Sequence, residues 1–282
     1  MSFPTWSDLN DEAVISPCRV SPRGAAPHGT NFHGAAGSRG MGKGPESDGV
    51  AVMVSTAPDF AHLKSRAGAG TCGPLFMGSV FTQSETGTMF SGPHMGAPYA
   101  TMVLENLIAR GAGTIFVFGW CGSISAGLAI GDIVVVEAGL SDEGTSKNYM
   151  ETGGDFPLIL PDPALKALLY NGLHKRKVPF KSGTVWTTDA IYRETPRKIE
   201  FFRDMGAVGV DMECAALFAV ARFRGVKIAA ILVVSDDLST LTWKPGFKSK
   251  QFKAVRKQVS DLLLDLSRCE FSNYHDFSKR DQ

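Results

Sequence analysis

The amino-acid sequence predicts an α/β protein, a three-layer α/β/α sandwich with a mixed, mainly parallel central sheet. From Val50 onward, short apolar runs alternate with segments whose apolar residues recur at the helical period. Strands that alternate with helices form mixed or parallel sheets with helices on both faces. The composition, 44% hydrophobic and 20% charged over 282 residues, fits a globular chain that buries a sizeable core.

Strands are predicted where apolar and β-branched residues cluster between turn residues. The predicted strands are 50–54, 75–81, 88–90, 114–118, 133–137, 183–186, 207–210 and 228–234. A Gly-rich turn is expected after residue 118, and an irregular stretch from Ser141 to Phe156.

Helices are predicted at 98–110, 163–175, 196–205, 213–224 and 249–268. Proline begins the first three of these, because its fixed φ suits the first helical turn. Gly111 marks the end of the first helix. The last helix has one apolar face, formed by Phe252, Val255, Val259, Leu262, Leu263 and Leu266.

Residues 1–48 differ from the rest of the chain. They are rich in Gly, Ala, Pro and Ser and contain few large apolar residues, so they cannot offset the entropy lost on ordering. We expect a flexible extension there, with a short amphipathic piece near residues 13–15. One folded domain is expected over 49–270, followed by a tail at 271–282.

Composition and charge exclude several classes of function. A net charge of +1 offers no basic face for nucleic acid. No signal peptide is apparent, and no apolar run approaches the roughly 20 residues of a membrane-spanning helix. The five cysteines are widely spaced and form no CxxC, which indicates reduced thiols in a cytoplasmic protein rather than disulfides or a zinc site. No metal ligand set is expected.

Acidic side chains follow two of the predicted strands. Strand 207–210 ends at Asp211, and Glu213 opens the next helix; strand 228–234 ends at Ser235, Asp236 and Asp237. Ligands of open α/β sheets bind outside the carboxyl ends of the strands. The sequence therefore predicts a site that contains carboxylates from two strands.

These acidic segments also resemble a known family. Residues 208–217 and 231–237 are similar to the nucleoside phosphorylase and nucleosidase family of the trimeric and hexameric type, which includes uridine phosphorylase. Segments 91–98, 119–133 and 183–192 agree with the same family in order and spacing. The resemblance covers about residues 50–266, and it implies the same α/β/α fold and a catalytic domain over 49–270.

The resemblance implies roles for the residues that match its motifs. Glu213 would hold the ribose hydroxyls, although an acid in the first turn of a helix is also favoured by the helix dipole. Met212 would pack on the sugar, or simply fill the core, and Asp211 would also bind substrate. Asp236 would be the acid near N7 of a purine, unless it is an ordinary loop acid or Asp237 takes the role.

The segment 183–192 corresponds to the base pocket of the family. Tyr192 would cover the base, and Ile191 stands where relatives have Phe, whereas Trp186 is at least as well explained as a core residue. Arg197 matches an Arg that contacts the base in the uridine enzymes. The Gln that accompanies this Arg in those enzymes is replaced by Thr195 here, so the set of residues that recognises a pyrimidine is incomplete. The remaining candidates in substrate binding are Gly119, Trp120, Cys121 and His94, with Cys121 better explained as a packed thiol than as a nucleophile.

This sequence departs from the family at the residues that bind the acceptor of the ribosyl group. Phosphorolytic relatives bind phosphate with two Arg residues and a Ser or Thr, and the matching positions are Phe60 (or Asp59), Val117 and Trp120. Phosphate binding prefers Arg, so these substitutions should weaken it. Asp59 is then the expected water-activating acid. His94 is an alternative base or a structural residue of its turn.

Together these expectations describe an enzyme that cleaves the N-glycosidic bond of a nucleoside, purine-type preferred, with phosphate or water as acceptor. The alternatives are a strict nucleosidase and a non-catalytic nucleoside-binding protein. No cofactor is expected, phosphate being possible as a co-substrate. The partner is a small-molecule nucleoside, not nucleic acid or a membrane, and the resemblance implies a homodimer or a trimer of dimers.

Overall fold

The computed structural model describes residues 49–151 and 154–277, with side chains through residue 268. The predictions for residues 1–48 and for the last residues of the tail lie outside this part of the chain. The final helix, α7 (Lys250–Phe277), continues into the stretch expected as a tail. None of the described helices has the length and apolar character to cross a membrane.

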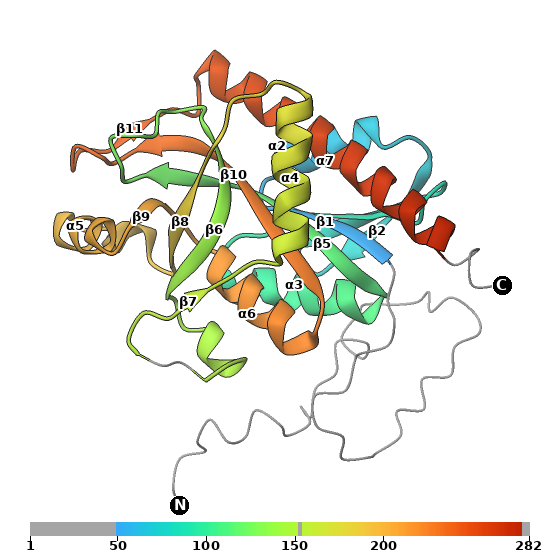
Figure 1. Ribbon diagram of the computed structural model, residues 1–282, viewed down its shortest axis with the longest axis horizontal. Coiled ribbons are helices and arrows are strands. Elements are labelled where there is room, and N and C mark those ends of the chain that lie inside the picture. Colours follow the sequence, from blue (N-terminus) through green and yellow to red (C-terminus); the bar gives the residue numbers. More distant parts are fainter. Residues whose placement is uncertain (1–48, 152–153, 278–282) are drawn as a thin grey trace, which may run out of the picture.

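A single mixed sheet forms the centre of the molecule (Figure 1). Its strands are β1 (Gly49–Val54), β2 (Gly70–Leu75), β3 (Gly78–Gln83), β4 (Met89–Gly92), β5 (Ala112–Ser123), β6 (Ile133–Asp142), β7 (Leu158–Ile159), β8 (Lys181–Thr188), β9 (Ala207–Asp211), β10 (Lys227–Asp237) and β11 (Lys244–Pro245). Their order is β11-β10-β6-β8-β9-β5-β1-β4-β3-β2, with β7 paired to β6.

The longest pairings of the sheet are parallel, as predicted. Strands β4, β1, β5 and β10 run parallel in that order, and so do β6, β8 and β9. The two sets are joined by antiparallel pairings between β10 and β6 and between β5 and β9. Because β10 also pairs with β5, the strands β5, β10, β6, β8 and β9 close into a ring.

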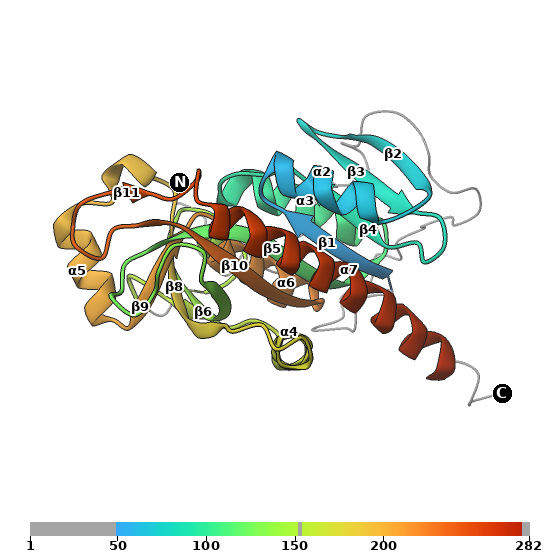
Figure 2. The same ribbon diagram turned by 90° about the horizontal axis from the view of Figure 1, so that it is seen from above.

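Helices cover both faces of the sheet (Figure 2). The helices are α2 (Ala57–Arg66), α3 (Ala97–Ala109), α4 (Pro163–Lys175), α5 (Pro196–Asp204), α6 (Cys214–Arg224) and α7, with short 3₁₀ turns η2 (Ser146–Asn148) and η3 (Ile191–Arg193). Helices α3 and α6 share one apolar core with the sheet, and α2, α4 and α7 share the other. Helix α5 packs on a third, smaller core around Trp186. The predicted α/β architecture is confirmed.

Three local features differ from the prediction. The predicted strand 75–81 is interrupted by a turn at Phe76 and Met77, with Phe76 at φ 53°, so that Leu75 ends β2 and residues 78–81 belong to β3. The expected Gly-rich turn at 119–123 is instead a continuation of β5, paired with β10. Helix α2 was not predicted because it is short and mostly polar, with Asp59, Phe60 and Leu63 as its buried residues.

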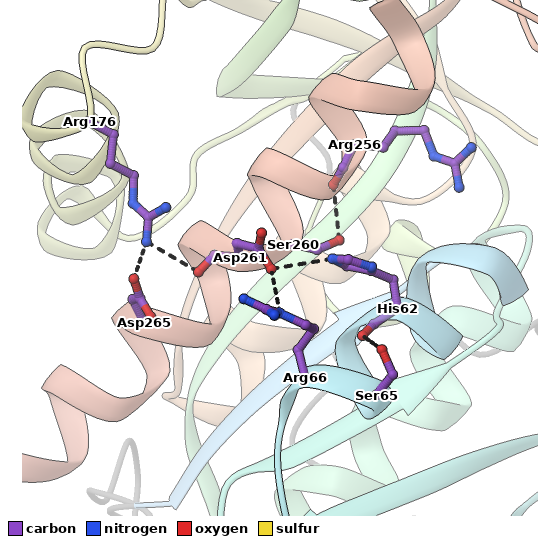
Figure 3. A network of polar contacts seen from close by, with 8 residues as sticks. All are labelled: His62, Ser65, Arg66, Arg176, Arg256, Ser260, Asp261 and Asp265. Carbon is purple, nitrogen blue, oxygen red and sulfur yellow. Dashed lines mark hydrogen bonds and ion pairs between the residues drawn. The ribbon is translucent and has the colours of Figure 1, made fainter. Parts of the chain in front are cut away.

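Ion pairs fix α7 against its neighbours (Figure 3). Arg176, just after α4, pairs with Asp265, and its guanidinium also donates to the Asp261 carbonyl at 3.3 Å. The Asp261 carboxylate lies 3.3 Å from His62 and 3.5 Å from Arg66, both on α2. These contacts hold three helices together on the α2–α7 side of the sheet.

Candidate active site

The first part of the site is the turn from β9 into α6, which Asp211 holds. The Asp211 carboxylate accepts a hydrogen bond from the Thr187 hydroxyl at 2.6 Å and from the backbone N–H groups of Glu213 and Cys214 at 3.1 and 2.8 Å. A carboxylate that accepts the first N–H groups of a helix acts as its cap. Asp211 was expected to bind substrate; in the structure both its oxygens accept hydrogen bonds, and Oδ2 fixes the turn that carries Glu213.

Glu213 is a buried acid beside that turn. Its side chain is 8% exposed, and Oε1 accepts the backbone N–H of Gly96 at 2.6 Å, which ties α6 to the start of α3. Burial, and next the Asp211 carboxylate, raise the pKa of Glu213 to about 8. Among the described residues, no cation forms an ion pair with it. Met212 precedes it and is half-buried.

Asp236 lies at the end of β10, beside Gly122 of β5. Its Oδ1 accepts from the Ser235 hydroxyl at 2.5 Å, and its Oδ2 accepts from the Trp243 indole at 2.9 Å. Asp237 accepts the Ser239 N–H at 2.8 Å and lies 3.6 Å from Lys244. These two contacts outweigh burial and lower the pKa of Asp237. Asp237 thus has an ion pair and a hydrogen bond to the loop that follows β10. Of the two neighbouring acids, this favours Asp236 as the candidate that contacts the base.

Glu194 is a site residue that the sequence analysis missed. It follows η3, and burial, together with the Asp236 carboxylate, raises its pKa to about 7. The only signal in the sequence was an acid two residues beyond the segment 183–192 that was assigned to the base pocket. The Glu194 carboxyl group is therefore close enough to Asp236 to feel its charge.

The other base-pocket predictions divide into buried and exposed residues. Trp186 is fully buried and stacks on Phe202 with ring centroids 4.4 Å apart, so it is a core residue. Tyr192 and Ile191 on η3 are 97% and 52% exposed, and Arg197 is exposed on α5. Within a single chain, the Tyr192 side chain is therefore exposed to solvent and does not cover a bound base.

Trp120 and Asp59 meet on the opposite side of β5. The Trp120 indole donates to Asp59 Oδ2 at 2.8 Å, and the Arg256 guanidinium donates to Asp59 Oδ1 at 2.9 and 2.7 Å. The Thr56 hydroxyl also donates to Oδ2 at 2.7 Å. Asp59 is only 3% exposed and saturated with partners, so the structure gives it a structural role in place of the expected water-activating one.

Several buried polar groups lack such partners. The hydroxyls of Ser55 and Ser91 and both ring nitrogens of His94 are buried and have no hydrogen-bond partner among the described residues. Burial lowers the pKa of His94 to about 4, so the ring is neutral near pH 7. Cys121 lies close by at 2% exposure, and burial, then Asp211 and Asp236, raise the pKa of its thiol, which excludes a resting thiolate.

The family model of the phosphorylase superfamily matches residues 50–268. A guanosine phosphorylase from Halorubrum lacusprofundi is 30% identical over 144 residues, which is 51% of this chain and 58% of that protein. The chain thus spans little more than half the length of this relative.

Solved structures share the fold. Purine nucleoside phosphorylase from Toxoplasma gondii, in complex with immucillin-H, superposes with a TM-score of 0.68 at 18% identity over 82% of this chain and 99% of that one. Futalosine hydrolase from Helicobacter pylori gives a TM-score of 0.63 at 16% identity, over 81% and 98%. Folds of both phosphorylases and hydrolases are therefore similar to this one.

Proposed function

Since the chain belongs to the phosphorylase superfamily, we propose that it cleaves the N-glycosidic bond of a nucleoside, with a purine-type base preferred. The observation that carries the proposal is the pair of acids at the carboxyl ends of β9 and β10. Glu213 is buried and held by the Gly96 N–H, and Asp236 is oriented by Ser235 and Trp243. Water or phosphate would be the acceptor, and the reaction as proposed needs no cofactor.

The two acids would act on opposite ends of the scissile bond. Cleavage passes through a ribosyl group with oxocarbenium character and a departing base that gains negative charge. Glu213 would bind the ribose hydroxyls, and Asp236 would donate a hydrogen bond or a proton to the leaving base. Glu194, with a pKa of about 7, is a further carboxyl group that is partly protonated near neutral pH.

A comparison of two variants tests these roles. Asp236→Asn keeps shape but cannot donate a carboxylic proton, so kcat for purine nucleosides should fall roughly 10²-fold or more, with binding largely intact. A nucleoside with an activated leaving group should be affected less. Glu213→Gln should slow both substrates, because its contact is with the sugar.

Equal losses for both variants on both substrates would show that the roles are wrongly assigned. A fully active Asp236→Asn protein would remove that residue from the mechanism.

The proposal extends to assembly and location. Three large side chains are highly exposed, Met77 at 85%, Met95 at 72% and Tyr192 at 97%. Since the resemblance to the family implies an oligomer, we propose at least a homodimer. Light scattering of the active protein would test this, and an active monomer would contradict it.

We also propose that the protein works in the cytoplasm. Cys121 and Cys214 are both free thiols, as is usual in that reducing compartment.

A further inference from the structure

The start of α6, which carries Glu213, is held by two side chains from the sheet. The parallel pairing of β8 with β9 places Thr187 opposite Asp211. The Asp211 carboxylate accepts the N–H groups of Glu213 and Cys214. The Thr187 hydroxyl accepts the N–H of the next residue, Ala215, at 3.0 Å. Such N–H groups have no partner inside their own helix, so the position of the α6 start depends on both side chains.

The Thr187 hydroxyl has a fixed direction. A hydroxyl group has one proton to donate and two lone pairs that accept. Since the Thr187 oxygen accepts the Ala215 N–H, its own proton goes to Asp211 Oδ1, 2.6 Å away. Burial raises the pKa of Asp211, and the hydrogen bond from Thr187 acts in the opposite direction. Thr187 is 0% exposed, so both of its contacts lie away from solvent.

The next residue of β8, Thr188, makes its contacts on the other face of the strand. Successive side chains of a strand point to opposite faces. The Thr188 hydroxyl donates to Asp142 at 3.3 Å, whereas Thr187 donates to Asp211. Thr188 is also buried, at 2% exposure. The two threonines therefore match in chemistry and burial and differ in which acid they hold.

The Glu213 side chain is also held at its far end. Its Oε1 accepts the Gly96 N–H at 2.6 Å, at the start of α3. Gly139 of β6 lets the start of α6 lie directly on the sheet, because a Cβ at this position would come within 2.8 Å of the Ala215 Cα. A misplacement of about 1 Å in an enzyme site can cost roughly 10²-fold in rate. A shift of the α6 start would therefore matter to whatever Glu213 binds.

From these contacts we infer that Thr187 is a positioning residue. Acting through Asp211 and the start of α6, it places the Glu213 carboxyl group at the hydroxyls of the sugar. The inference rests on the proposed nucleoside cleavage and adds to it a residue that contacts no substrate itself. The effect is selective: loss of the Thr187 hydroxyl weakens recognition of the sugar and leaves the action of Asp236 on the base unchanged.

The test measures sugar recognition by the full chain. Base release is followed with inosine, adenosine and guanosine and with their 2′-deoxy and 3′-deoxy analogues, in phosphate buffer so that water and phosphate are both present. Thr187→Val keeps the shape but removes the hydroxyl, and it should lower kcat/KM for the ribonucleosides roughly 10-fold. The analogue that lacks the hydroxyl bound by Glu213 should lose several-fold less.

Glu213→Gln should give the same pattern of losses across the substrates. The double variant of Thr187→Val with Glu213→Gln should lose little more than Glu213→Gln alone, because both changes affect one contact. Asp211→Asn is a second route to the same pattern, since the amide offers one acceptor oxygen fewer; it carries the test if Thr187→Val does not fold.

Two variants are matched controls. Thr187→Ser keeps the hydroxyl and should retain the original pattern, and Thr188→Val removes a buried hydroxyl from the other face and should not change it, whatever its effect on stability. Equal losses on all substrates for Thr187→Val, or a Thr187→Ser protein as impaired as Thr187→Val, would overturn the positioning role but leave the proposed function intact. Equal losses on all substrates for Glu213→Gln as well, or no cleavage of any nucleoside by the original chain, would overturn both.

Discussion

The two sides of the sheet differ in how their buried acidic side chains are paired. On the α2–α7 side, the buried Asp59 carboxylate has Arg256 as its ion pair at 2.7 Å, together with donors from Trp120 and Thr56. On the α3–α6 side, Glu213 has one backbone donor and no ion pair among the described residues, and the pKa of this group is raised.

This difference distinguishes structural from functional acids. A buried carboxylate with a cation and several donors is satisfied and helps to hold two helices together. Glu213 has no cation among the described residues, and its pKa of about 8 leaves it mostly protonated near pH 7, so its burial is better explained by what it binds. Asp59 already has all its partners, which argues against a water-activating role, and the role of Glu213 in binding the sugar stays a prediction. Four measurements test this difference between the two sides of the sheet.

The largest effect is expected on the α2–α7 side. Arg256→Gln leaves Asp59 buried without its cation, so the free energy of unfolding should fall by about 3–5 kcal/mol, measured by urea denaturation. The double variant Asp59→Asn with Arg256→Gln should lose less, because no unpaired charge remains. A loss of under about 1 kcal/mol in the single variant would show that the pair does not stabilise the fold.

Glu213→Gln should give the opposite result. Base release should slow by roughly 10²–10³-fold, because a group aimed at the reacting sugar is lost. The free energy of unfolding should stay the same or rise, since the variant removes a buried ionisable group. Denaturation and steady-state rates on one preparation would check both. A strongly destabilised variant would place Glu213 with Asp59 as a structural acid.

His94 predicts an acid-sensitive stability. Its folded pKa is about 4 and the unfolded value is 6.5, so the unfolded chain binds more protons between these values. The contribution of His94 to the free energy of unfolding should therefore decrease as the pH falls from 6.5 towards 4, by up to about 3 kcal/mol. His94→Gln should reduce that decrease. Identical pH profiles of the variant and the original chain would mean that His94 is not buried as neutral imidazole.

The smallest effect is expected at the surface network of α7. Asp261, with a side chain 36% exposed, pairs with His62 and Arg66, whose side chains are 23% and 61% exposed. Solvent screens such pairs, so Asp261→Asn should lower the free energy of unfolding by about 1 kcal/mol or less. A loss as large as that of Arg256→Gln would mean that exposure does not separate these contacts.

Much of the fold followed from local signals in the sequence. Helix α4 has the predicted bounds, Pro163–Lys175, and helices α3, α5 and α6 differ from the prediction by a residue or so. Proline at the helix starts and apolar periodicity are properties of neighbouring residues, which is why the sequence was enough. The acids at the ends of β9 and β10 were found in the same way.

Burial and partnership across the chain were decided by tertiary structure. Gly119–Ser123 reads as a turn, but pairing with β10 makes it strand. Asp59 and Arg256 are 197 residues apart, and Glu213 and Gly96 are 117 apart, so no local pattern shows that the first acid is neutralised and the second is not. The motifs determined which residue types occur in the site. Long-range packing determined which of them remain without partners, and therefore which are left to act on a ligand.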